Sequence, residues 1–342
     1  MITLCRGGRR LVLVLALLCC VCRGASSAPS ETRTPLVLVA DVPLPGKAVR
    51  FDYQDIDSSK QRLFIAHMSD ASVVVVSTVD GASIKVISGV PTPRGIVVAG
   101  DAKRVFVTSS PSKLVIIDSE SLNELGRVAT GRGPDGVAWD PVHRVVGVSD
   151  QGDGALSLLA DAGMGAHQQV ALGSETGNVV FDSARNVFWI TVEAAAGPDQ
   201  LVSVDPSAAR VVTRIPLPGC SGAHGLRLHP NGQSALIACE GNSKLARVEL
   251  EGKHAVVLAP SGSDPDVLAI DAALGWLYVA AESGDLRIFD LAKPGLVSLG
   301  QQRPGPASHS VAVDPTTHHV FFPLAVGPHG TPVLRIMRPA AP

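Results

Sequence analysis

Short apolar runs of four to eight residues, bounded by Gly, Pro, Asp or Ser, recur along the chain and predict β-strands. The first run of each group ends at a repeated position, called here the frame position, after which a turn leads to the next run. The frame residues are spaced 41 to 47 residues apart and are Asp57, Ala99, Asp140, Asp182, His229, Asp271 and Asp314. No window of helical length shows a sustained apolar period of 3.6 residues. The pattern therefore predicts seven copies of one all-β unit.

A second position, seven residues after each frame residue, is aromatic in five copies: Phe64, Phe106, Trp189, Tyr278 and Phe321. One short sheet cannot cover both of its faces, so a period in the forties with several strands per unit is typical of a propeller blade stacked on its neighbours. We expect a seven-bladed β-propeller in one domain over residues 34–339. Its blades are expected to start near residues 50, 94, 135, 177, 224, 266 and 309.

The seventh repeat has one strand too few. It supplies apolar runs at 311–314, 319–324 and 332–337 and then ends in a Pro-rich tail. An isolated strand at 35–42 precedes the first repeat and is the natural fourth member. Pairing of this N-terminal strand with the seventh repeat removes the sheet edges that an open ring would expose. We therefore predict that the N-terminal strand completes the last blade.

Residues 1–28 have the pattern of a secretory signal peptide: arginines, an apolar run at 11–22, and small residues up to Ala28. Twelve apolar residues fall short of the roughly 20 needed to span a bilayer, so no membrane span is expected. Cys19 and Cys22 leave a lipid-anchored alternative, although bulky residues precede both. The prediction is export to the periplasm or the cell exterior.

The charge balance argues against nucleic acid as a partner. Removing the leader, which has four arginines and no acidic residue, leaves 25 Lys and Arg against 31 Asp and Glu. A nucleic-acid surface needs a basic stripe. Most aromatic residues are also accounted for by the repeat, which leaves few for base stacking. A monomer without a nucleic-acid partner is expected.

Two cysteines, Cys220 and Cys239, remain after the leader. They flank the first two strands of the fifth repeat, and antiparallel pairing around the turn at 229–234 brings their ends together. Because an exported protein can be oxidised, we favour a disulfide between them. Two buried free thiols and a thiolate metal site are the alternatives.

A third repeated position lies five residues before the frame, where each innermost strand begins, and holds Asp52, Arg94, Asp135, Gly177, His224, Asp266 and His309. Six of the seven residues are polar or ionisable, whereas the positions two and four residues later are mostly apolar. In a propeller these strand starts converge on one face, around the central channel. We expect Asp52, Arg94, Asp135, His224, Asp266 and His309 to form a ligand-binding channel mouth.

The connections between second and third strands emerge on the same face. There, blades 4 to 6 carry Glu193, Glu240 and Glu282 eleven residues after the frame. Two imidazoles with carboxylates suit a divalent cation, so His224, His309, Asp266, Glu240 and Glu282 are candidate metal ligands. The structural alternative is that these residue types favour tight turns and hold channel waters.

The frame aspartates and the nearby His143, His318 and His319 are assigned to turns on the opposite face. We expect those three histidines to be exposed. His229 replaces a frame aspartate and is expected to share its structural role.

Several segments carry a resemblance to a known family. FVTS (106–109) and LYVAA (277–281), with third strands ending in VIID (115–118) and VSVD (202–205), resemble the YVTN-repeat, YncE-type β-propellers. The resemblance covers the chain from about Thr34 onward and favours exported bacterial members. It implies the propeller fold. Relatives of this shape include surface-layer modules, DNA binders, ligand-binding scaffolds and, more distantly, metal-dependent lactonases and lyases, so it does not fix the activity.

The function that these observations favour is an exported scaffold that binds a small ligand or a protein partner at the mouth. A metal-dependent, lactonase-like hydrolase or lyase at the same mouth is the first alternative. A cell-surface structural or interaction module is the second. Beyond the leader, no GxSxG, phosphate-loop, CxxC or HExxH motif is present, so the sequence leans away from an enzyme.

Overall fold

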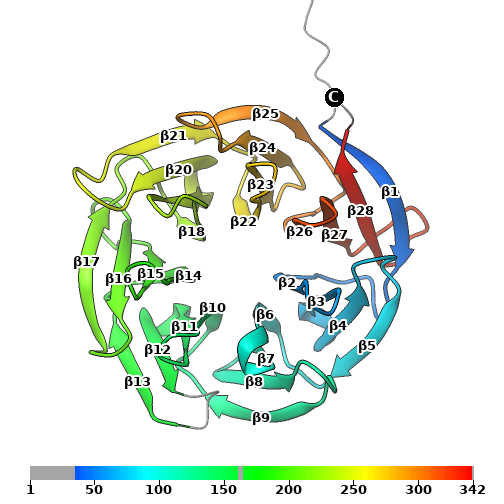
Figure 1. The fold of residues 1–342 in the computed structure, drawn as a ribbon, viewed down its shortest axis with the longest axis horizontal. Helices are drawn as coiled ribbons and strands as arrows, with labels where there is room; N and C mark the ends of the chain where they lie inside the picture. Colours follow the sequence, from blue (N-terminus) through cyan, green and yellow to red (C-terminus); the bar gives the residue numbers. More distant parts are fainter. Residues whose placement is uncertain (1–34, 161–164, 341–342) are drawn as a thin grey trace, which may run out of the picture. The chain divides into compact units, whose positions relative to one another are not determined.

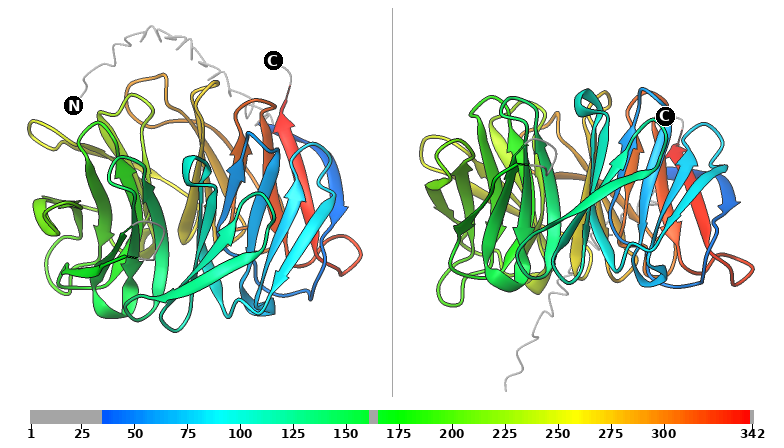
Figure 2. Two further views of the ribbon diagram at one scale, coloured as in Figure 1. Left: turned by 60° about the horizontal axis from the view of Figure 1, so that its bottom comes forward. Right: turned by 90° about the horizontal axis from the view of Figure 1, so that it is seen from below.

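The computed structural model describes residues 35–160 and 165–340; the predicted leader lies outside these ranges. The described residues form seven four-stranded antiparallel sheets arranged around a central axis (Figure 1). In the side views of Figure 2 the strands run between two faces that carry the loops. The prediction of an all-β, seven-bladed propeller is confirmed.

Each blade is described from its innermost to its outermost strand. Blade 1 consists of β2 (Gln54–Asp57), β3 (Arg62–His67), β4 (Ser72–Ser77) and β5 (Ser83–Ser88), and blade 2 of β6 (Pro93–Ala99), β7 (Arg104–Ser109), β8 (Lys113–Asp118) and β9 (Glu124–Ala129). Blade 3 consists of β10 (Pro134–Asp140), β11 (Val145–Asp150), β12 (Ala155–Ala160) and β13 (His167–Ala171), and blade 4 of β14 (Thr176–Asp182), β15 (Val187–Val192), β16 (Gln200–Asp205) and β17 (Arg210–Pro216). Blade 5 consists of β18 (Ala223–Leu228), β19 (Ser234–Cys239), β20 (Lys244–Glu249) and β21 (Val256–Pro260), and blade 6 of β22 (Pro265–Asp271), β23 (Trp276–Ala281), β24 (Leu286–Asp290) and β25 (Val297–Gln302). Blade 7 consists of β26 (Ala312–Asp314), β27 (His319–Leu324), β28 (Val333–Pro339) and the N-terminal β1 (Leu36–Pro43).

The N-terminal strand β1 closes the ring as predicted, because it pairs antiparallel with β28 and completes blade 7. The Arg335 guanidinium donates to both carboxylate oxygens of Asp41, over 2.8 and 2.6 Å. Leu36 is buried, and its backbone N–H and C=O both bond to the Gln302 side-chain amide of blade 6, at 3.1 Å each. The first strand is therefore tied to two blades at once.

The core lies between adjacent blades, where the repeated aromatic position packs. Phe64, Phe106, Tyr278 and Phe321 are fully buried there. In blade 3 the equivalent position holds Gly147 instead of an aromatic residue. The reason is steric: a Cβ at this position would lie 2.8 Å from the Phe188 ring of the next blade. The absence of a side chain at Gly147 of blade 3 leaves room for the Phe188 ring of blade 4.

The frame aspartates organise the turns between first and second strands, on the face opposite the mouth. The Oδ1 of Asp140, for example, accepts hydrogen bonds from the backbone N–H groups two and three residues later, at 2.8 and 3.0 Å. His229 does the same with its ring, because its Nδ1 accepts from Asn231 N at 3.2 Å. A turn role for these positions is confirmed.

The histidines of these turns only partly meet the expectation. His143 is exposed, as predicted, but His318 and His319 are half-buried. The His318 Nδ1 lies 2.7 Å from Asp271 Oδ2, so this ring bridges blades 6 and 7. The expectation that all three are exposed was wrong because it treated each turn as free of its neighbouring blade.

Cys220 and Cys239 form a disulfide with a Cα–Cα distance of 5.3 Å. The bond joins the end of β19 to the segment before β18, next to the mouth. No helix in residues 35–160 and 165–340 has the length and apolar character needed to cross a bilayer.

Candidate functional site

β-Bulges form the mouth. In blades 2 to 6 the innermost strand gains one residue against its neighbour near its first residue. The bulged segments contain the predicted mouth residues Arg94, Asp135, His224 and Asp266, and Gly177 at the equivalent position of blade 4. A bulge interrupts pairing and re-aims a side chain. The regular alternation of each strand is thus broken at the point where the polar side chains turn toward the channel.

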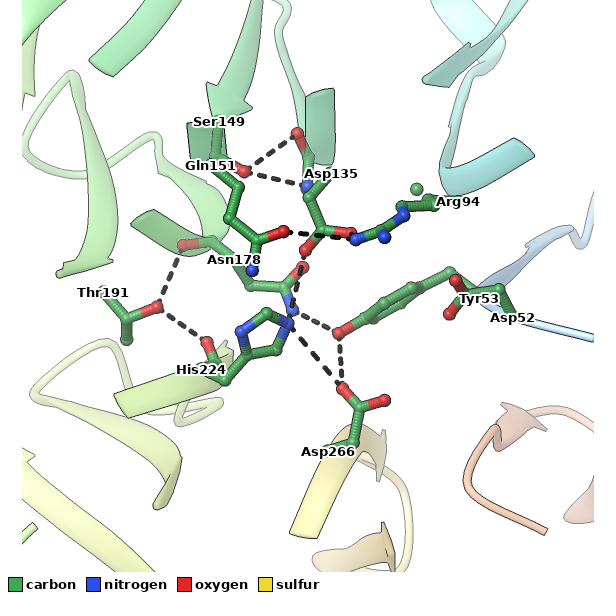
Figure 3. Close-up of polar contacts among 12 residues, drawn as sticks. Asp52, Tyr53, Arg94, Asp135, Ser149, Gln151, Asn178, Thr191, His224 and Asp266 are labelled. Carbon is green, nitrogen blue, oxygen red and sulfur yellow. Dashed lines mark hydrogen bonds and ion pairs between the residues drawn. The ribbon is translucent and has the colours of Figure 1, made fainter. Parts of the chain in front are cut away.

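Hydroxyl groups on the second strands hold these bulges in place (Figure 3). The Thr108 Oγ1 accepts from Gly95 N at 2.8 Å and donates to the backbone oxygen of Asp135, in the next blade, at 2.7 Å. The Thr191 Oγ1 donates to the backbone oxygen of His224, also in the next blade, at 2.7 Å. Each hydroxyl therefore fixes the position of a mouth residue on a neighbouring blade.

Glycines let the blades approach closely at the same level. A Cβ on Gly95 would lie 2.2 Å from Asp135 O, and one on Gly225 would lie 1.8 Å from Asp266 O. Real Cβ atoms do not occur at such distances from a backbone oxygen, so a side chain at either position would push two blades apart.

A cavity of about 350 Å³ opens at the mouth. It is lined by Arg50, Asp52, Tyr53, Met68, Arg94, Asp135, His224, Glu240, Asp266 and Glu282. The sixth predicted mouth residue, His309, is buried beside this lining, with its Nε2 3.8 Å from Asp52 Oδ1. The structure thus brings all six predicted residues together, with Glu240 and Glu282 around them.

His224 lies among three carboxylates. Its Nε2 is 3.2 Å from Asp135 Oδ2 and 4.0 Å from Asp266 Oδ1, and its Nδ1 is 3.9 Å from Glu240 Oε1. Burial alone would lower the pKa of His224, but the hydrogen bond and charge of Asp135, with the other two carboxylates, raise it to about 10. At neutral pH this ring is therefore an imidazolium.

The same cluster shifts the carboxyl groups. Burial raises the pKa of Asp135, but its contacts with His224 and Arg94 outweigh burial and lower it overall. Burial raises the pKa of Glu240 to about 7, assisted by the charges of Asp266 and Glu193 and opposed by that of His224. Burial also raises the pKa of Asp266. Glu240 is thus a mouth carboxyl that changes charge near neutral pH.

Arg94 covers the other side of the mouth. Its Nη1 lies 3.4 Å from Asp135 Oδ1 and 3.2 Å from Gln151 Oε1 (Figure 3). This guanidinium remains partly exposed, with a side chain that is 32% accessible, so it can also meet a molecule in the cavity.

Tyr53 and Asn178 were not among the site residues predicted from the sequence. The Tyr53 hydroxyl donates to Asp266 Oδ1 at 2.8 Å and accepts from Asn178 Nδ2, so these groups span the channel below the mouth (Figure 3). Tyr53 also lines a lower cavity of about 260 Å³. Both residues lie one position after the repeated strand-start position, where Gly95, Gly136 and Gly225 stand in other blades. Large polar side chains at an otherwise glycine-rich position were the signal that could have identified them.

Arg50 was missed as well, because it lies outside the repeated position. Its Nη2 donates to Glu282 Oε1 at 2.6 Å. Burial raises the pKa of Glu282, but this contact and the charge of His309 outweigh burial and lower it overall. Glu282 is therefore an ionised partner of an arginine.

Within the described residues, two groups of side chains could hold a metal ion. Asp52, Asp266 and His309 form one, and His224, Glu240 and Asp266 form the other. In each group the potential ligand atoms lie within 4.8 Å of one another. Asp266 is common to both, Asp52 was not among the predicted metal ligands, and the predicted ligand Glu282 belongs to neither group.

Comparisons with known proteins establish the fold. A chain of hydrazine synthase from Kuenenia stuttgartiensis is similar to this protein with a TM-score of 0.74 and 15% sequence identity, over 85% of this chain and 96% of that one. No protein-family model and no curated protein matches the sequence. At this identity the likeness concerns the propeller architecture alone.

Proposed function

We propose that the protein is an exported, monomeric binding scaffold of the YVTN-repeat, YncE type, and that its channel mouth holds a small ligand. The observation that supports this most strongly is the cavity of about 350 Å³ into which charged side chains from different blades converge. A volume of this size lies in the range of small-molecule sites. Export is supported by the predicted signal peptide and agrees with an oxidised Cys220–Cys239 pair.

Burial favours a small ligand over a protein partner. Asp52, Asp135, Asp266 and His309 are each no more than 5% exposed. They lie at or below the floor of a concave site, whereas a protein partner would need such groups on an accessible surface. Only a ligand that enters the cavity can reach them.

The free-energy cost of burying these charged groups also supports a ligand-binding role for the mouth. Charged groups removed from water lower stability unless they are fully paired. Buried nitrogens of Arg94, Arg50 and His309 have no hydrogen-bond partner in the described structure. Incompletely paired charges around a cavity are what a ligand-binding site requires, since the ligand completes their contacts.

A thermal-shift screen tests the proposal. The probes are metal chlorides, polyamines, amino acids, dicarboxylates and monosaccharides, each measured with and without EDTA. The variants are Arg94→Gln and Asp135→Asn, and the matched control is Arg185→Gln, an arginine paired with Asp182 at 2.9 Å on the opposite face. We expect at least one probe to raise the melting temperature of the wild type and the control more than that of the mouth variants. No stabilising probe, or equal shifts in all proteins, would overturn the proposal.

A further inference from the structure

The side chain of His309 has the orientation that metal-binding histidines adopt. Its Nδ1 faces Ala307 O at 3.4 Å and Glu282 Oε2 at 3.8 Å. Its Nε2 points the other way, toward Asp52 Oδ1 at 3.8 Å. Metal-bound histidines commonly place one ring nitrogen on the metal and the other against a carboxylate or carbonyl oxygen. One edge of the His309 ring is therefore held by the protein, and the other is presented to Asp52.

The presented nitrogen is buried without a hydrogen-bond partner, although the Asp52 carboxylate lies 3.8 Å away. His309 is 4% exposed, and its Nε2 makes no hydrogen bond within the described residues. A buried polar nitrogen without a hydrogen-bond partner lowers the stability of the folded protein. Such groups are rare in folded proteins, and a bound ion is one established reason for them.

Both carboxylates beside this nitrogen are also buried, and one is positioned by a further contact. The Tyr53 hydroxyl holds Asp266 Oδ1 at 2.8 Å, which leaves Oδ2 without this contact. Glu282, behind His309, is itself held by Arg50 at 2.6 Å. Groups that orient ligands in this way are typical of metal sites and tune their affinity.

We propose that Asp52, Asp266 and the Nε2 of His309 bind one first-row divalent transition-metal ion at the base of the mouth cavity. This inference rests on the proposed function, because the ion would lie in the same mouth and form part of its ligand. The three side chains come from blades 1, 6 and 7, which the β1 closure brings side by side.

The spacing and chemistry of the three side chains suit such an ion. Their ligand atoms lie within 4.8 Å of one another. Ligands at about 2.0 to 2.2 Å from a zinc ion are about 3 to 4 Å apart, so small side-chain rotations would close the site. One imidazole with two carboxylates suits zinc, manganese or ferrous iron better than an all-oxygen calcium cage. Three protein ligands leave coordination positions open toward the cavity.

The second group of potential ligands is less suited to the ion. The His224 Nε2 already contacts Asp135 Oδ2 at 3.2 Å, so the nitrogen that would reach Asp266 is occupied. The Nη1 of Arg94 also contacts Asp135, with its Oδ1 at 3.4 Å. The structure therefore assigns the ion to the His309 side of Asp266.

Calorimetric titration of the EDTA-treated full-length protein with zinc chloride tests this site. We expect about one equivalent of zinc to bind, with a calcium affinity at least tenfold weaker. Asp52→Asn and His309→Gln should each weaken zinc binding at least 100-fold. Glu282→Gln, which affects only the positioning of His309, should weaken it about 10- to 100-fold. The matched control is His143→Gln, because His143 pairs with Asp140 at 2.6 Å on the opposite face but belongs to no group of three potential ligands within the described residues.

Equal zinc affinity in the wild type and His309→Gln would overturn the inference, as would the absence of zinc binding below millimolar concentration. Should a variant fail to fold, anomalous scattering from zinc-soaked wild-type crystals decides: density between Asp52, Asp266 and His309 supports the site, and density elsewhere contradicts it. The absence of a zinc site would not by itself refute the proposed binding of a small ligand at the mouth. A metal-free probe whose stabilising effect depends on Arg94 would preserve it even if zinc does not bind.

Discussion

Replacing Gly225 by alanine tests the close approach of blades 5 and 6 that shapes the mouth. An added Cβ would lie 1.8 Å from Asp266 O and 2.8 Å from Leu268 Cδ1. The φ of Gly225 lies outside the left-handed region, so alanine suits its backbone conformation and the effect is steric. Because an ordinary contact is about 3.4 Å or longer, the two blades must separate locally by more than an ångström.

Overpacking of this kind costs typically 1 to 3 kcal/mol. For a large domain, each kcal/mol lowers the melting temperature by about 2 to 4 °C, so Gly225→Ala should melt about 2 to 12 °C below the wild type. The displacement also moves Asp266, and zinc binding should weaken in the same variant.

Differential scanning calorimetry of Gly225→Ala and of Gly126→Ala provides the comparison. A Cβ on Gly126, in the outermost strand β9, has no atom within 4 Å. Alanine there should leave the melting temperature unchanged or raise it slightly, since glycine weakens a strand interior by roughly 0.5 to 1 kcal/mol. Indistinguishable melting of the wild type and Gly225→Ala would refute the steric reasoning.

Three further predictions concern closure, oxidation and pH. Leu36→Ala should lower the free energy of unfolding in urea by about 2 to 5 kcal/mol, whereas Val37→Ala, at a position that is 36% exposed, should cost well under 1 kcal/mol. Reducing the Cys220–Cys239 disulfide, whose cysteines are 19 residues apart, should cost about 3 kcal/mol in the same assay if constraint of the unfolded chain dominates. The folded-state pKa of Glu240, about 7, exceeds its ordinary value of 4.5, so its favourable contribution is complete below pH 4.5 and is lost as the pH rises through 7. In metal-free buffer, Glu240→Gln should therefore raise the melting temperature above pH 7 and change it little at pH 5. A rise in melting temperature that occurs only at low pH would contradict the predicted direction.

The fold could be predicted from the sequence because each blade repeats the same constraints. The turn aspartates recur at nearly constant spacing, and Asp140 shows why: its carboxylate accepts backbone N–H groups that the turn leaves unpaired. The missing fourth strand of the last repeat left the N-terminal strand as its natural partner. Contacts between blades were harder to foresee. The bridge from His318 to Asp271 depends on how neighbouring turns face each other, which the repeat alone does not specify.

The mouth was located from the repeat, but its internal contacts were not. The position of Asp52, Asp266 and His309 at equivalent strand starts places them on one rim. The repeat does not reveal which side chains bond to one another across the channel, and for that reason Tyr53, one residue after Asp52, was missed. Which side chains pair within the mouth also depends on the distances between their charged atoms. Glu282 pairs with Arg50, and His224 pairs with Asp135. These preferences emerge only from three-dimensional geometry.

The central claim is that the buried charges of the mouth serve ligand binding and not the stability of the ring. Thermal unfolding of the double variant Asp52→Asn/His309→Gln, with and without zinc, tests it most directly. We predict that the metal-free variant melts at or above the wild-type temperature, because incompletely paired charges have been neutralised, and that zinc raises the melting temperature of the wild type only. A metal-free variant that melts well below the wild type, or equal stabilisation of both proteins by zinc, would contradict the claim.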